Sequence, residues 1–175
     1  MRKLDRKRCL IYYIGKIATI VLVLTVMSPV NASLTVVRDP YCPETNPITA
    51  KLRDLVQASP HKATVEMGDT AIQVIRAYES CASNYKRKGN LEKFVYSVAQ
   101  GAPMYMFASQ CFLHSDHRAD AITTLDAGSA RIVDALKQST NFKALSPLLR
   151  PYFERYRGQL EASLAEVRAL RAQIS

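Results

Sequence analysis

Apolar side chains recur at intervals of three and four residues along most of the chain that follows residue 48. This spacing places them on one face of a helix, so it predicts an all-α domain built from successive helices. We expect helices over residues 49–59, 63–88, 91–100, 104–113, 118–138, 142–149 and 152–173. No segment alternates apolar and polar residues for long enough to predict a strand.

Short segments that disfavour helix separate these elements. Gly89-Asn90 is typical of a helix end followed by a turn, because glycine tolerates the left-handed conformation that closes many helices. Gly101-Ala102-Pro103 predicts a break, since proline removes a backbone donor and clashes with the preceding turn. Connections this short join antiparallel neighbours. They predict helical hairpins, arranged either as a degenerate repeat array or as an irregular bundle.

The segment that precedes the helical domain is rich in proline. Pro40, Pro43 and Pro47 each lack a backbone donor and restrict the residue before them. We therefore expect an extended arm over residues 33–47 and the helical domain over residues 48–175.

Residues 1–32 have the organisation of a secretory signal peptide. Basic residues precede an apolar run at 17–27, and Val30 and Ala32 occupy the positions that a signal peptidase recognises. This pattern predicts export to the periplasm or beyond, with cleavage after Ala32. The alternative is an uncleaved anchor in the inner membrane over residues 9–27. Lys16 interrupts that run, and a spanning helix needs about 20 apolar residues.

The net charge changes meaning once its position is known. The 175 residues include 24 Lys and Arg against 15 Asp and Glu, a net charge of +9 that suggests a nucleic-acid partner. Removal of residues 1–32 leaves 18 basic and 14 acidic residues and a net charge of +4. The remaining basic residues lie among acidic ones, apart from residues 86–88, which is typical of a solvated surface. We therefore expect no nucleic-acid partner.

Cysteine and histidine residues supply the candidate chemistry. Cys9 lies in the predicted signal, and the three other cysteines permit one disulfide in an oxidising compartment. His114 and His117 are the only candidate metal ligands, but they lie in a predicted turn, where histidine serves as polar surface. No motif for a nucleophile, a metalloprotease or a phosphate loop is present. We expect no catalytic residue, no metal and no cofactor.

Two segments share a spacing of aromatic and small residues. The first contains Tyr78, Cys81, Ala82 and Tyr85, and the second contains Tyr105, Ala108, Ser109 and Phe112. Each is followed by a turn and by an apolar pair, at Phe94/Val98 or at Ala121/Leu125. Over about residues 78–133 this pattern resembles a pair of tetratricopeptide-like helical hairpins.

The resemblance has consequences for the cysteines and for the surface. The first helices of successive repeats stack side by side, which implies a Cys81–Cys111 disulfide with Cys42 left over. The rival pairing joins Cys42 to one of these two cysteines. Helical hairpin arrays bind peptides or partner helices on one face. With the aromatic residues assigned to packing, the binding face is expected to carry Arg76, Asn84, Lys88 and Gln110.

Together these features predict an exported helical protein that acts in protein–protein interaction as a binding or scaffold module. The first alternative is a single-span, membrane-anchored component of a secretion or envelope complex. The second is an envelope enzyme or a metal carrier that uses the region of His114 and His117.

Overall fold

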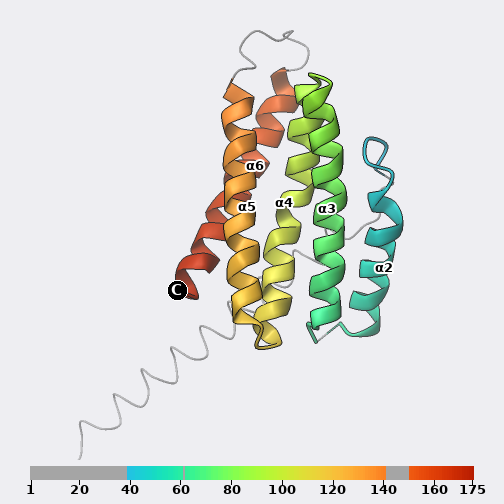
Figure 1. Cartoon of the computed structure of the whole chain (residues 1–175), viewed down its shortest axis with the longest axis vertical. Helices are drawn as coiled ribbons and strands as arrows, with labels where there is room; N and C mark the ends of the chain where they lie inside the picture. Colours follow the sequence, from blue (N-terminus) through green and yellow to red (C-terminus); the bar gives the residue numbers. More distant parts are fainter. Residues whose placement is uncertain (1–38, 61, 141–149) are drawn as a thin grey trace, which may run out of the picture. The chain divides into compact units, whose positions relative to one another are not determined.

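The structure, a computed structural model, describes residues 39–60, 62–140 and 150–175. Every regular element in these ranges is helical, which confirms the all-α prediction (Figure 1). The helices are α2 (Thr45–Ala58), α3 (Val65–Arg87), α4 (Leu91–His114), α5 (Arg118–Ser139) and α6 (Arg150–Gln173). The predicted signal peptide or anchor and the helix expected over residues 142–149 lie outside the described residues. Within the described ranges, no helix has the length and apolar character that a membrane span requires.

Helix α4 lies at the centre of the helical packing. It contacts α3, α5 and α6, while α6 also packs against α5, and α2 packs against α3 (Figure 1). Helices α3, α4 and α5 are joined by turns of three residues, so consecutive helices run antiparallel. Among the residues of α4, only Glu92, Lys93 and His114 can carry a charge near neutral pH, which suits a helix with packing partners on several faces. The hairpins expected from the short turns are thus present around a shared central helix.

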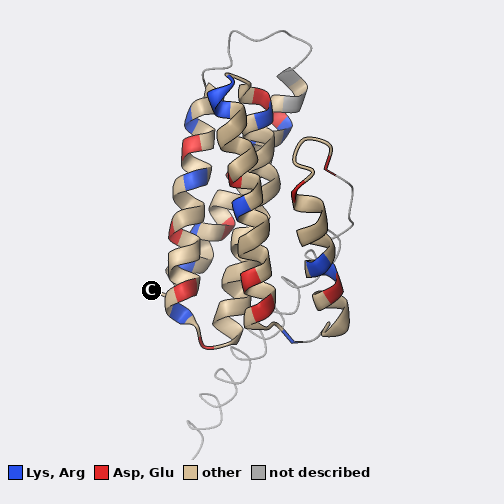
Figure 2. Cartoon of the chain, turned by 45° about the vertical axis from the view of Figure 1, so that its right-hand side comes forward, with Lys and Arg blue, Asp and Glu red and all other residues tan. Residues whose placement is uncertain are grey.

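Charged side chains occupy the exposed faces of the surrounding helices. Figure 2 shows basic and acidic residues interspersed along these helices. Ion pairs among the described residues involve partly exposed side chains, as in Lys86–Asp134 and Arg157–Glu161. Such pairs contribute about 0–1 kcal/mol each. Burial of apolar side chains along α4 therefore holds these helices together.

The break predicted at Gly101-Ala102-Pro103 is wrong, because α4 continues through it. Pro103 lies on the exposed side of the helix, where its ring displaces no core side chain. Ala102 is fully buried, and a Cβ on Gly101 would lie 3.1 Å from the Cβ of Tyr78 on α3. The close packing of these two small residues offsets the backbone bond that the proline cannot make.

Helix α2 begins at Thr45, four residues earlier than expected and inside the predicted arm. Pro47 is the third residue of this helix, a position where the missing backbone donor has no intrahelical partner to lose. In the described part of the predicted arm, residues 39–44 form a compact turn and residues 45–47 begin α2. We call residues 39–44 the arm turn. The prediction of an extended segment is therefore wrong for these residues.

The turns between the helices follow local rules that the sequence contains. The side chain of Thr64 accepts a hydrogen bond from the backbone of Met67 at the start of α3, and Asn90 does the same for Lys93 at the start of α4. Gly89, between these helices, has a φ of +68°, which a residue with a Cβ adopts only at a cost. Helix α4 begins at the predicted residue, after the predicted turn at Gly89-Asn90, and α3 begins two residues later than predicted.

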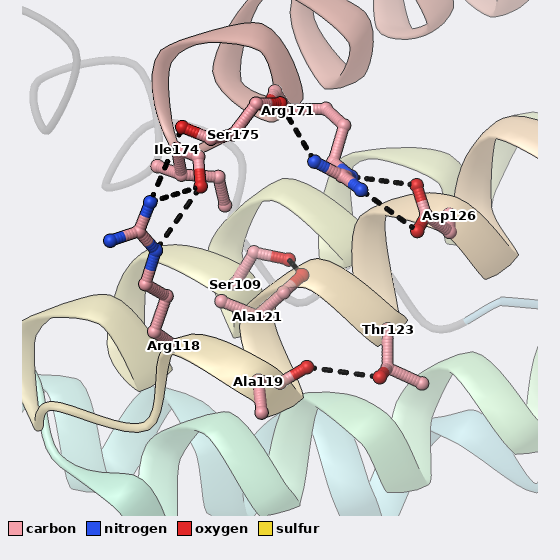
Figure 3. Close-up of polar contacts among 9 residues, drawn as sticks. All are labelled: Ser109, Arg118, Ala119, Ala121, Thr123, Asp126, Arg171, Ile174 and Ser175. Atoms are coloured by element: carbon pink, nitrogen blue, oxygen red, sulfur yellow. Dashed lines mark hydrogen bonds and ion pairs between the residues drawn. The ribbon is translucent and has the colours of Figure 1, made fainter.

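The end of α6 is joined to α5 by two arginine side chains (Figure 3). Arg118 donates to the carbonyl of Ile174 at 2.6 and 3.1 Å and to that of Ser175 at 3.4 Å. Arg171 donates to both carboxylate oxygens of Asp126, at 2.8 and 3.4 Å. The contacts position the last residues of the described chain beside the first half of α5.

Candidate functional site

A buried carboxylate organises the arm turn. Asp39 is only 6% exposed, and its side chain accepts four hydrogen bonds. One oxygen accepts from the backbone N–H groups of Tyr41 and Cys42 at 2.8 and 2.9 Å. The other accepts from the hydroxyl groups of Tyr78 on α3 and Tyr96 on α4, both at 3.0 Å. The carboxylate therefore shapes the turn and attaches it to two helices of the bundle.

The two tyrosines are held in the protonated form that this arrangement needs. Burial, followed by the charge of Asp39, raises the pKa of Tyr78 well above its ordinary value. The same two causes raise the pKa of Tyr96. Both phenols therefore remain hydrogen-bond donors throughout the physiological pH range.

Cys42 of the arm turn lies close to Cys81 of α3. The Cys42 and Cys81 side chains approach to 2.7 Å, and no bond joins them. The Cys42 sulfur also lies 3.3 Å from the hydroxyl of Ser97 on α4, and the Cys81 thiol donates to a carboxylate oxygen of Glu44 at 2.8 Å. Cys42 and Cys81 are 0% and 4% exposed. This site joins the arm turn, the start of α2, α3 and α4.

The surroundings make both thiols weak acids. Burial raises the pKa of Cys42, although hydrogen bonds from Cys81 and Ser97 lower it in part. Burial, followed by the contacts with Cys42 and Glu44, raises the pKa of Cys81 further. A thiol reacts as its thiolate, so neither group in this docked state is an activated nucleophile.

Aromatic rings cover the outer side of the same site. The ring of Tyr41 is 41% exposed and makes an edge-on contact with Tyr96 at 5.1 Å between centroids. The ammonium group of Lys93 lies 4.8 Å from the centre of the Tyr41 ring and 5.5 Å from that of Tyr85. The Tyr85 hydroxyl donates to the backbone carbonyl of Tyr41 at 2.7 Å. The surface over the arm turn is thus aromatic and basic, and we call Tyr41, Tyr85 and Lys93 the tyrosine–lysine surface.

The structure does not bring Cys81 and Cys111 together. Cys111 lies near the end of α4, and its sulfur is hydrogen-bonded to the backbone of Thr64, just before α3 begins. Cys81 lies 17 residues further along α3, which is about 25 Å of helix. A disulfide requires Cα atoms within about 7 Å of each other. The repeat resemblance implied that the two cysteines lie on the first helices of neighbouring hairpins. They lie instead on the consecutive helices α3 and α4, whose antiparallel directions place Cys111 beside the start of α3.

The four residues expected on a binding face are distributed over two helices. Arg76, Asn84 and Lys88 are exposed at α3 or directly after it, and Asn84 accepts a hydrogen bond from Arg87 at 2.6 Å. Gln110 is half-buried on α4, and its side-chain oxygen has no hydrogen-bond partner among the described residues. The first three are thus exposed polar residues at successive points along α3 and its C-terminal end, whereas Gln110 lies on another helix.

His114 and His117 are both exposed, and His117 has a carboxylate partner. His117 lies 3.1 Å from a carboxylate oxygen of Asp120, and His114 is the last residue of α4. No group of three or more metal-ligating residues occurs in the part of the chain that the structure describes.

A cavity lined by Tyr105 and Arg131, among others, has a volume of about 10 Å³, which is space for about one water molecule.

Sequence patterns gave no indication of the role of Asp39, Tyr96 or Ser97. A local signal for the turn is present, since aspartate side chains often bond to the backbone two or three residues further on. The tyrosine partners of Asp39 lie 39 and 57 residues away, at positions that periodicity assigns only to helices.

The known proteins offer no guide to this site. No family model, no curated protein and no solved structure matches the chain.

Alkaline titration is expected to unfold the protein as its buried tyrosines ionise. The pKa values of Tyr78, Tyr96 and Tyr105 are raised in the folded chain, and that of an unfolded tyrosine is about 10. Their contribution to stability is therefore complete below pH 10 and is lost progressively above it.

Phenolate absorbance and circular dichroism, recorded against pH, measure this coupling. Three of the nine tyrosines should ionise only as the helical signal disappears, and the loss should be shallower in a Tyr78→Phe/Tyr96→Phe variant. Full ionisation near pH 10 with an intact helical signal would contradict the expectation.

Proposed function

We propose that this protein is an exported helical module that binds a protein or peptide partner without catalysis. The tyrosine–lysine surface is the observation that carries the proposal. Among the side chains whose burial the structure describes, Tyr41 is the one large apolar side chain that is exposed, and the buried contacts of Asp39 fix its backbone. Tyrosine is enriched among the residues that dominate binding energy, because a rigid ring offers much contact area at a low entropic cost.

The proposed binding face also includes the three polar residues expected from the sequence. Arg76 and Asn84 are exposed on the helix that carries Tyr85, and Lys88 directly follows that helix. The repeat resemblance assigns the same three residues to a binding face. We infer that the partner contacts α3 and the arm turn together, as partners do on the faces of helical hairpin arrays.

Charge reversal on α3 tests the proposal. The partner is captured by crosslinking to the wild-type chain in the native envelope fraction, and the complex is then rebuilt from purified components. The Arg76→Glu/Lys88→Glu variant should bind at least about tenfold more weakly, as should Tyr41→Ala. Arg168→Glu, an equally exposed change on α6, is the matched control and should bind normally. Unchanged affinity of both test variants would overturn the proposed face.

Export is tested separately by N-terminal sequencing of the protein isolated from cells. A first residue of Ser33 supports a cleaved signal peptide. An intact N-terminus in the membrane fraction supports the anchored alternative, in which the same module remains attached to an envelope complex.

A further inference from the structure

Cys42 and Cys81 are placed for bond formation although they lie 39 positions apart in the sequence. Their side chains approach to 2.7 Å. The bond of a disulfide is about 2.05 Å long, so the sulfur atoms need to approach by only about 0.7 Å. The hydrogen bonds of Asp39 fix one side of this pair, since they hold the backbone N–H of Cys42 at 2.9 Å. On the other side, Cys81 is part of the regular backbone of α3.

We propose that Cys42 and Cys81 form an intramolecular disulfide that fastens the arm turn to α3, with Cys111 remaining a thiol. The proposal rests on the geometry of the arm turn and is independent of the proposed binding partner. It selects one of the pairings that the cysteine count leaves open. It also gives the arm turn a covalent attachment in addition to the hydrogen bonds of Asp39.

The oxidant is a disulfide, either of a small thiol or of a dithiol oxidoreductase. One cysteine attacks this disulfide as a thiolate, forms a mixed disulfide and releases one reduced thiol. The second cysteine then attacks the protein sulfur of the mixed disulfide, forms the Cys42–Cys81 bond and releases the other reduced thiol. Two protein thiols are thus oxidised while one external disulfide is reduced, and the two protons are taken up by the departing thiolates or by solvent.

Local chemistry assigns different tasks to the two cysteines. Cys42 belongs to the arm turn, the part that separates from α3 in the first step, whereas Cys81 remains in the regular backbone of α3, so Cys42 is the better candidate for the first attack. The Cys81 thiol donates to the carboxylate of Glu44 at 2.8 Å. Glu44 is therefore placed to pass the proton of Cys81 to the departing thiolate or to solvent as Cys81 attacks the mixed disulfide.

Burial determines when oxidation takes place. Cys42 is 0% exposed while the arm turn is docked, so an external disulfide cannot reach its sulfur. The first step then requires that the arm turn separates from α3, during folding or by local opening. Redocking returns Cys42 to Cys81 and completes the bond. We therefore expect oxidation to be slow in the folded, reduced protein and fast during refolding.

Among the residues that the structure describes, Cys111 has no comparable partner. It is 2% exposed, and burial raises the pKa of its thiol to about 12. Its contact with Thr64 lies at the opposite end of α3 from Cys81. This cysteine is a buried apolar side chain of α4 and provides an internal control for the test.

Peptide mapping of the full chain tests the pairing directly. The protein is refolded with glutathione disulfide, its remaining thiols are alkylated, and the digest is analysed without reduction. The proposal expects one linked pair of peptides containing Cys42 and Cys81, with Cys111 alkylated. Alkylation of both Cys42 and Cys81, or a bridge that includes Cys111, would overturn it.

Thermal unfolding measures the consequence of the bond. Reduction should lower the Tm of the oxidised wild-type protein by about 10 °C, because a link that closes a loop of about 40 residues restricts the unfolded chain. The Cys111→Ser variant should show the same decrease. Cys42→Ser and Cys81→Ser should show none, and a decrease that persists in either would contradict the pairing. Peptide mapping of the wild-type chain decides the question even if a variant fails to fold.

Discussion

Replacing Asp39 by alanine is expected to lower the free energy of unfolding by about 3–5 kcal/mol. The change leaves the hydroxyl groups of Tyr78 and Tyr96 and the backbone N–H groups of Tyr41 and Cys42 without their acceptor. Each buried donor left unpaired costs about 1–3 kcal/mol, and contact with water recovers part of this for the two hydroxyl groups. Loss of the attachment should also release the arm turn from α3 and α4.

Urea unfolding followed by circular dichroism measures this effect, with Asp54→Ala as the matched control. Asp54 is an exposed aspartate that forms an ion pair with the neighbouring Arg53, so its replacement should change stability by less than about 1 kcal/mol. Asp39→Asn keeps one acceptor oxygen and should fall between the two. If Asp39→Ala unfolds within about 1 kcal/mol of the wild type, the carboxylate does not hold the arm turn.

Local periodicity was sufficient to predict most helices. Helix α3 was expected over residues 63–88 and spans Val65–Arg87, and α5 was expected over residues 118–138 and spans Arg118–Ser139. In both helices, a few turns of sequence are enough to show an apolar face and an opposite polar face, which together predict a helix. The helix break predicted at Pro103 was wrong because the prediction considered only the local effect of proline. The residues on both sides of Pro103 are buried, and their packing keeps α4 continuous.

The site was much less accessible to prediction, because its members are distant in sequence. Asp39 gives a local turn signal, but nothing near it in the chain identifies Tyr96 as its partner. The pairing of Cys42 with Cys81 depends on how the arm turn docks on α3. The number and spacing of cysteines in a sequence do not determine which of them pair. The repeat resemblance placed Cys111 beside Cys81, where the antiparallel α4 does not bring it.

Close packing between helices gives the second large effect, at Gly128 of α5. A Cβ at this position would lie 2.7 Å from Cγ and 2.9 Å from Cβ of Tyr105 on α4. These atoms form the base of the tyrosine side chain, which cannot move without moving α4. The Tyr105 hydroxyl also donates to Glu79 of α3 at 2.6 Å, so a shift of the ring disturbs a contact with a third helix. Gly128→Ala should therefore lower the free energy of unfolding by about 1–3 kcal/mol.

Gly158→Ala in α6 is the matched control, and the expected sign is opposite. Gly158 is exposed, and an added Cβ would meet no atom within 4 Å. Alanine in a helix interior is more stable than glycine by about 0.5–1 kcal/mol, because it restricts the unfolded chain. The same gain applies at Gly128, so the difference between the two variants isolates the cost of separating α5 from α4. Equal stabilisation of both variants in urea unfolding would show that Tyr105 and Gly128 are not in close contact.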